Sequence, residues 1–118
     1  MIERRWWPPI LWAAVILIGT SWPRIQLPPV EGGDKLLHAL VYTVLGVLTT
    51  RAALMGSRRA ATLALVVGGI AIFGALDELH QAWIPGRYPS MADWWADALG
   101  GTAGSLASWV SRSTRAVA

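Results

Sequence analysis

Three short groups of ionisable residues lie at the edges of apolar segments, and they hold the side chains that could do chemistry. These groups are Asp34, Lys35 and His38; Asp77, Glu78 and His80; and Asp93 and Asp97. A charge at the edge of a hydrocarbon segment is costly unless it faces a protein interior, a wet cavity or a partner. We therefore expect the groups to form a polar site.

The first group continues along one face of a predicted helix. Positions four residues apart share a face, so Asp34, His38 and Tyr42 form one stripe that is expected to point into a bundle. Lys35 can extend toward the membrane surface. Asp34 follows two glycines and also fits a helix N-cap. His38 suits either a hydrogen bond between helices or a role in ligand binding or proton transfer.

The second group places two carboxylates side by side. Asp77 and Gln81 are one helical turn apart, whereas the adjacent Asp77 and Glu78 point about 100° apart. We expect one of the two acids to face inward and the other to face the loop that follows. With His38, they are the candidate acid–base residues. The spacing matches no recognised zinc motif.

The third group follows a turn. Pro85-Gly86 favours a tight turn, which places Arg87 near the outer surface. Arg87 is suited to bidentate recognition of phosphate or carboxylate, and an ion pair with a nearby acid is the simpler alternative. Ser90 stands three residues before Asp93 and is predicted to cap the last helix.

Asp93 and Asp97 are one turn apart, so their charges repel each other. Either one of them is neutral, or Lys35, Arg87 or a bound cation offsets them. A solvated face is a poor explanation for Asp97, because apolar sequence follows it.

Four apolar stretches must position these groups. They cover residues 8–22, 36–54, 60–80 and 93–110. Each can cross a hydrocarbon core of about 30 Å with some help from its flanks, and only helices or a closed barrel can do so. We predict one all-α domain over residues 1–118, an integral membrane bundle of four transmembrane helices.

The last stretch carries a repeat of small residues. Gly100, Gly104 and Ser108 recur every four residues, a pattern that lets transmembrane helices approach closely. Asp97 continues this stripe, so the last helix is predicted to be central in the bundle.

The composition agrees with a membrane protein. Hydrophobic residues make up 54% of the 118 positions and charged residues 14%. The absence of cysteine excludes disulfides, thiolate metal sites and cysteine nucleophiles. The net charge of +3 comes from basic residues that flank apolar stretches, which favours contact with lipid headgroups over nucleic acid.

The basic residues also predict an orientation. With a cytoplasmic N-terminus, seven of the ten lie inside, and only Arg24, Lys35 and Arg87 lie outside. Both termini are then cytoplasmic, and most acidic residues, Glu31 among them, gather at the outer end. The first stretch has the basic start of a signal peptide, but no small-residue cleavage site follows it, so we expect it to be retained.

The combined motifs resemble the VanZ-like family of small bacterial membrane proteins. They read Asp34-Lys35-x-x-His38-x-x-x-Tyr42, Asp77-Glu78-x-x-Gln81 and Pro85-Gly86-Arg87-x-x-Ser90-x-x-Asp93-x-x-x-Asp97-x-x-Gly100. The resemblance covers residues 34–104 and implies a multi-pass protein of the bacterial cytoplasmic membrane. Founding members of the family are associated with resistance to the glycopeptide antibiotic teicoplanin. The family usually carries Asn at the position of Asp97, so a neutral amide role is not carried over.

Our leading hypothesis is an outward-facing polar pocket that engages the headgroup of an envelope lipid or a cell-wall precursor. Lys35 and Arg87 would meet its anionic groups. The expected binding residues are Asp34, Lys35, His38, Tyr42, Asp77, Glu78, Gln81, Arg87, Ser90, Asp93 and Asp97.

Two alternatives stay open. The first is a membrane hydrolase or transferase that acts on a lipid-linked phosphate or sugar. Its divalent cation would be held by Asp77, Glu78 and Asp97, with His38 as the acid or base. The second is a structural role, in which the charges form a buried network within a subunit of a larger membrane complex.

Overall fold

The computed structural model describes residues 2–22, 33–55 and 60–117, and within these residues the chain is all-helical with no strand. A 3-10 turn at Arg4–Trp6 leads into four helices. They are α1 (Trp7–Thr20), α2 (Gly33–Leu54), α3 (Ala60–Gln81) and α4 (Met91–Val117). The predicted all-α class is confirmed.

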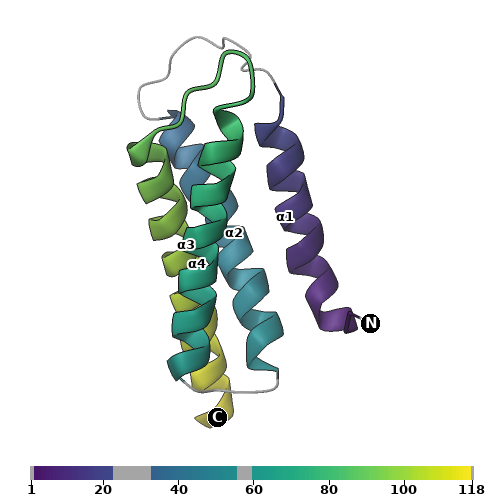
Figure 1. The fold of residues 1–118 in the computed structure, drawn as a ribbon. Coiled ribbons are helices and arrows are strands. Elements are labelled where there is room, and N and C mark those ends of the chain that lie inside the picture. Colours follow the sequence, from purple (N-terminus) through teal and green to yellow (C-terminus); the bar gives the residue numbers. More distant parts are fainter. Residues whose placement is uncertain (1, 23–32, 56–59, 118) are drawn as a thin grey trace.

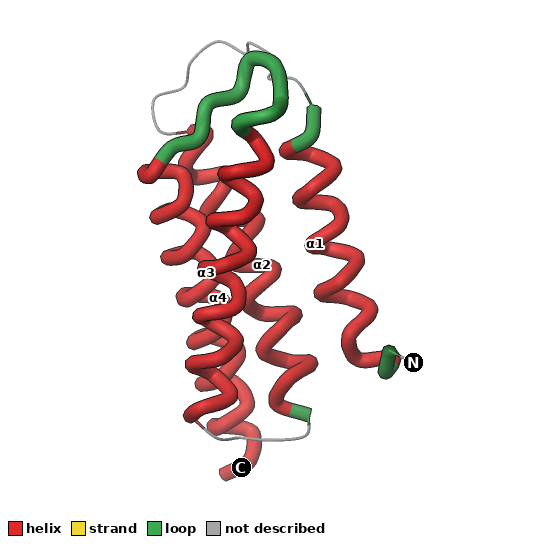
Figure 2. The backbone as a smooth tube through the Cα atoms, viewed as in Figure 1, coloured by secondary structure: helices red, strands yellow, loops and turns green. Residues whose placement is uncertain are grey.

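The helices lie side by side in a bundle with two distinct ends. The N- and C-termini lie at one end, here called the terminal end, and residues 82–90 connect α3 to α4 at the opposite end, the loop end (Figures 1 and 2). Helices α2, α3 and α4 form a close group. Helix α1 lies beside this group and diverges from it toward the terminal end (Figure 1).

Two helix boundaries differ from the predicted ones by three residues or more, and the others agree within two residues. Helix α2 begins at Gly33, so Asp34 lies in its first turn and not at its N-cap. An acid in the first turn still interacts favourably with the helix dipole. Helix α4 continues to Val117, seven residues past the predicted end at 110. The prediction followed the apolar run, whereas α4 is amphipathic and does not need to end where that run ends.

Two helices of the described chain, α2 and α3, are long and apolar enough to cross a membrane. Only 33% of the apolar window of α2 and 22% of that of α3 is buried in the bundle, whereas a core helix of a soluble protein is mostly buried. On α3, Leu65, Ile72 and Leu76 all have more than half of their surface exposed. These side chains can face lipid. Helix α1, with 14 residues, is shorter than the usual span of about 20.

Helices α2 and α4 pack with their backbones in contact. A Cβ atom added at Gly100 would collide with the main chain of Ala39, and one added at Gly104 would collide with that of Thr43. The buried Ser108 continues the same stripe. The small residues therefore serve the predicted purpose. The predicted central position of α4 is wrong: among the described residues α4 packs on α2 and α3 only, whereas α2 and α3 each contact all three other helices.

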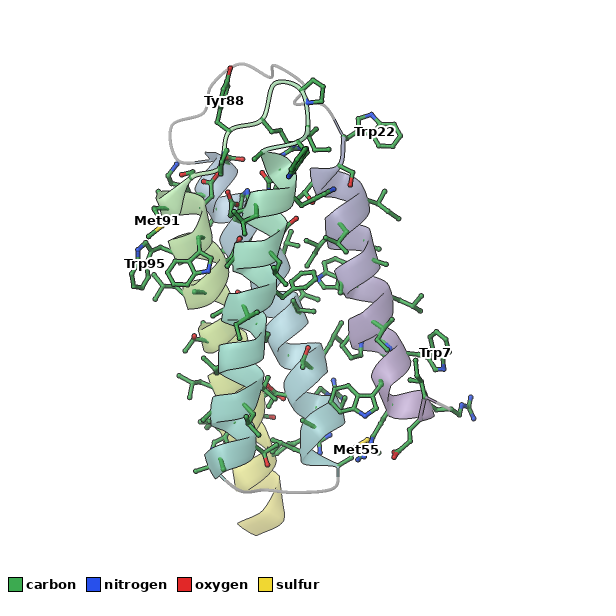
Figure 3. The ribbon with its side chains drawn as sticks, in the orientation of Figure 1. Trp7, Trp22, Met55, Tyr88, Met91 and Trp95 are labelled. Atoms are coloured by element: carbon green, nitrogen blue, oxygen red, sulfur yellow. The ribbon has the colours of Figure 1, made fainter. Side chains whose placement is uncertain are left out.

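An apolar core joins α1 to α2 and α3. Its buried side chains are Ile16, Tyr42, Leu45, Val66 and Ile70. The indole Nε1 of Trp12 donates a hydrogen bond to the carbonyl of Val41 at 2.9 Å, which attaches the middle of α1 to α2. Trp7 at the terminal end and Trp22 at the loop end point away from the bundle (Figure 3).

Candidate functional site

The centre of the polar site is a histidine–aspartate pair between α2 and α4. Nδ1 of His38 lies 2.7 Å from Oδ1 of Asp97, and both residues are buried. When Asp97 is ionised its carboxylate can only accept a hydrogen bond, and Nδ1 is then the donor. The pair therefore directs the other ring nitrogen, Nε2, away from Asp97.

Two further carboxylates lie beside Nε2. Oδ1 of Asp34 and Oδ2 of Asp93 are each 3.9 Å from it, beyond hydrogen-bonding distance. The side chain of Asp93 is 11% exposed, whereas that of Asp34 is 42% exposed. The cluster thus runs from a buried interior to the surface at the loop end.

The repulsion expected between Asp93 and Asp97 is offset by a different partner for each. Nζ of Lys35 lies 3.6 Å from Oδ1 of Asp93, and His38 bonds to Asp97. One oxygen of each acid, Asp93 Oδ1 and Asp97 Oδ2, is buried without a hydrogen-bond partner among the described residues. The site holds more acid than its neighbouring cations neutralise.

The two adjacent acids of α3 point in different directions, as predicted. Asp77 faces inward, where Tyr42 donates a hydroxyl hydrogen bond to Oδ2 at 3.1 Å and Thr20 donates one to Oδ1 at 2.7 Å. Glu78 faces the start of α4, where its Oε2 accepts the backbone N–H of Ser90 at 3.0 Å. Asp77 therefore joins α1, α2 and α3, and Glu78 joins α3 to α4.

Ser90 is the predicted N-cap of α4. Its Oγ accepts the backbone N–H of Asp93 at 3.3 Å, which satisfies one of the free donors in the first turn. Gln81 donates to Oε1 of Glu78 at 3.4 Å and is almost fully buried. Glu78, held by Gln81 and Ser90, fixes the start of α4 and with it the position of Asp93.

Arg87 lies apart from the acidic cluster. Its Nε donates to the carbonyl of Trp22 at 2.8 Å, and its Nη2 donates to that of Gly19 at 3.4 Å. A cation at a helix C-terminus interacts favourably with the free carbonyls and the dipole there. Neither the ion pair nor the pocket position expected for Arg87 is seen among the described residues.

Two groups of described side chains have the spacing of a metal site, and both contain His38. One is Asp34, His38 and Asp93, and the other is His38, Glu78 and Asp97; within each, the ligand atoms lie within 4.8 Å of one another. Asp77, which the sequence grouped with Glu78 and Asp97, belongs to neither group. Its oxygens accept hydroxyl hydrogen bonds from other helices.

Sequence reasoning missed Thr20 as part of the site. Its position could have indicated this role. Thr20 is a hydroxyl residue near the end of the first apolar stretch, and Asp77 lies near the end of the third, which is predicted to reach the same side of the membrane. Next to it, Ser21 Oγ lies 3.5 Å from Nε2 of His80. These contacts bring α1 to the loop end of the other helices.

Fold and site together define a helical membrane protein with a buried polar cluster at one end of its bundle. The sequence matches the family described as VanZ/LLP1 over residues 5–112, and the chain belongs to this family. The match reaches from the start of α1 into α4, and so includes the first helix, which the motif resemblance had left out. No curated protein and no solved structure matches the chain.

Proposed function

We propose that this VanZ-like protein binds the headgroup of an envelope lipid or a lipid-linked cell-wall precursor at the loop end of its bundle. One observation carries the proposal. Buried polar side chains from α2, α3 and α4 converge at that end, and they reach the surface through Asp34 and Lys35. An intramembrane cluster of this kind is a functional site by default.

The proposed topology is a multi-pass protein of the bacterial cytoplasmic membrane with four spans and both termini in the cytoplasm. Both termini lie at the same end of the bundle (Figure 1), which supports it. The described basic side chains at that end are Arg4, Arg5, Arg51 and Arg112. Lys35 and Arg87 are at the loop end, whereas Arg24, Glu31, Arg58 and Arg59 lie outside the described residues. This distribution agrees with the positive-inside rule.

Lys35 is the cation that is placed to meet an anionic group. Its side chain is 53% exposed and lies at the edge of the cluster, 3.6 Å from Asp93. The hydrogen bonds of Arg87 to the end of α1 give that residue a structural role. Of the two cations that were predicted to meet the headgroup, Lys35 and Arg87, only Lys35 is therefore retained. The carboxylates of Asp34 and Asp93 suit amine or hydroxyl donors. A headgroup that carries both a phosphate and such donors fits best.

Binding a cell-wall precursor would change which molecules reach it from outside. We propose this as the route by which the chain would influence glycopeptide susceptibility, the property associated with the family's founding members.

The test is headgroup binding by purified protein in nanodiscs that contain a lipid-linked precursor or an anionic phospholipid. We expect Lys35→Ala to weaken binding about tenfold, since it removes a charge-assisted contact worth about 1.5 kcal/mol. Arg51→Ala is the matched control, because it removes an exposed charge at the terminal end. Equal binding by wild type and Lys35→Ala would reject the proposal.

A second candidate, a hydrolase or transferase acting on a lipid-linked phosphate or sugar, is favoured by the His38–Asp97 pair. A carboxylate bonded to Nδ1 leaves the lone pair on Nε2, the arrangement of a general base. Release of phosphate from a lipid-linked diphosphate by wild type but not by His38→Asn would establish it. No turnover by the wild type rejects it.

A further inference from the structure

We propose that Nε2 of His38 and the carboxylates of Asp34 and Asp93 hold one divalent transition-metal cation at the loop end, with Asp97 orienting the imidazole ring. This inference does not depend on the proposed headgroup function, because it concerns the cluster alone.

The distances suit a shared cation. Both carboxylate oxygens lie 3.9 Å from Nε2, too far for a hydrogen bond. Two ligand atoms of a tetrahedral zinc ion lie about 3.4 Å apart, given metal–ligand bonds of about 2.1 Å. Each carboxylate must therefore approach Nε2 by about 0.5 Å, which a side-chain rotation supplies.

The ring is held in the orientation that a ligand needs. A histidine that binds a metal through one nitrogen usually donates its other N–H to a carboxylate, which fixes the tautomer and raises the basicity of the ligand. Asp97 provides that acceptor at 2.7 Å from Nδ1 and is fully buried. Asp97 is therefore a positioning residue for His38 and not itself a ligand.

Asp93 provides the independent sign of a missing partner. The residue is 8% exposed, yet its Oδ1 has no hydrogen bond among the described residues, and its Oδ2 points toward Nε2. Lys35 lies 3.6 Å away with a half-exposed side chain, so it neutralises this acid only in part. A buried charge without full compensation is strongly unfavourable, and a bound cation removes that cost.

The second group of potential ligands is less suitable. Both oxygens of Glu78 already accept hydrogen bonds, from Ser90 and Gln81. On its Asp97 side, His38 presents the protonated Nδ1 and not a lone pair. A cation there would have to replace three hydrogen bonds, those of Glu78 with Ser90 and Gln81 and that of Nδ1 with Asp97.

The donor atoms indicate the class of metal. One imidazole nitrogen and two carboxylates suit Zn²⁺ or Mn²⁺, and a chain without cysteine has no thiolate to favour softer ions. Three protein ligands also leave coordination positions for water or another oxygen ligand.

The test is direct metal binding by the full chain, expressed without a histidine tag, purified in detergent and treated with chelator. Co²⁺ is titrated and followed by its visible absorption, and Zn²⁺ is then used to displace it. We expect one Co²⁺ per chain. Asp34→Asn, which changes a partly exposed side chain and should leave the helical circular dichroism unchanged, should weaken binding at least tenfold.

Three more variants define the site. His38→Ala and Asp93→Asn should abolish saturable binding, and Asp97→Asn should weaken it about 10–100-fold by releasing the ring. His80→Ala is the matched control, because it removes the chain's other histidine and should bind as wild type does. Wild-type affinity in Asp34→Asn or Asp93→Asn overturns the proposal, as does loss of binding in His80→Ala or a protein that binds no Co²⁺.

Adding the metal to the phosphate-release assay separates this site from the general-base alternative. A ligated Nε2 cannot accept a proton, so turnover that uses His38 as the base would be inhibited by the metal. No lipid is present in the titration, and failure of headgroup binding therefore leaves its result unaffected.

Discussion

The two ends of the bundle are built in opposite ways. At the loop end, α2, α3 and α4 enclose a cluster of acids around His38. Toward the terminal end, α1, α2 and α3 line an open apolar groove with a volume of about 570 Å³, whose lining includes Pro9, Leu45, Val66 and Phe73. One region is polar and joined by specific bonds, and the other is apolar and open on one side.

The comparison shows that α1 contributes differently to the two ends. At the loop end, it is bonded through Thr20 to Asp77 and through its carbonyls to Arg87. Further along, Trp12 bonds to α2, and beyond it α1 diverges from its neighbours (Figure 1). The hydrogen bonds that hold α1 to the other helices are therefore concentrated near the loop end, where the polar side chains meet. Toward the terminal end, α1 is farther from its neighbours (Figure 1).

The largest effect should come from breaking the polar end. His38→Ala leaves the fully buried Asp97 without its hydrogen-bond partner and with an uncompensated buried charge, so we expect a loss of about 3–5 kcal/mol in the free energy of unfolding. Unfolding by SDS in mixed micelles, followed by circular dichroism, measures it. His80→Ala, at a half-buried position, should cost less than about 1 kcal/mol. Equal losses in the two variants would mean that the polar cluster is not held together by the pair.

A smaller loss of stability is expected from disturbing the close contact between α2 and α4. Gly104→Ala places a methyl group against the main chain of Thr43, and forced separation of the helices should cost about 1–3 kcal/mol. Gly68→Ala is the control, because its added Cβ meets nothing within 4 Å. That variant should be unchanged or up to about 1 kcal/mol more stable. A Gly104→Ala protein as stable as Gly68→Ala would show that the close approach is not needed.

The smallest effect is expected at the apolar groove. Gly69 lines it, and a Cβ there meets nothing within 4 Å. Gly69→Leu should raise stability by about 1 kcal/mol through helix propensity and burial of part of the new side chain. Gly68→Leu, at a position that does not line the groove, gains helix propensity without this burial and so separates the two contributions. Metal binding at the loop end should stay the same, and a change there would show that the two regions are coupled.

Local features of the fold could be predicted from the sequence. The helical spacing placed His38 and Tyr42 on the buried face of α2, and Ser90 was recognised as a cap from its position before Asp93. The stripe through Gly104 indicated a close helix contact. Each of these depends on residues within a few turns of one helix, where periodicity and capping preferences apply.

The contacts between helices could not be predicted in the same way. His38 and Asp97 are 59 positions apart, and their meeting depends on the relative height of α2 and α4. The main-chain contact at Gly100 sets that height, and no sequence pattern gives its value. Arg87 was expected near acids because opposite charges attract. The backbone carbonyls at the end of α1 are equally good acceptors. Every residue has a backbone carbonyl, so the sequence does not indicate which of them Arg87 contacts.

In the short connection between α3 and α4, a residue that contacts α1 and a residue that caps α4 are only three positions apart in the sequence. Arg87 grips the end of α1, and Ser90 begins the helix that carries Asp93. A displacement of the end of α1 would therefore be passed through residues 87–90 to the first turn of α4. The first helix is thereby connected to Asp93 through the backbone of this segment, in addition to its direct contact with Asp77.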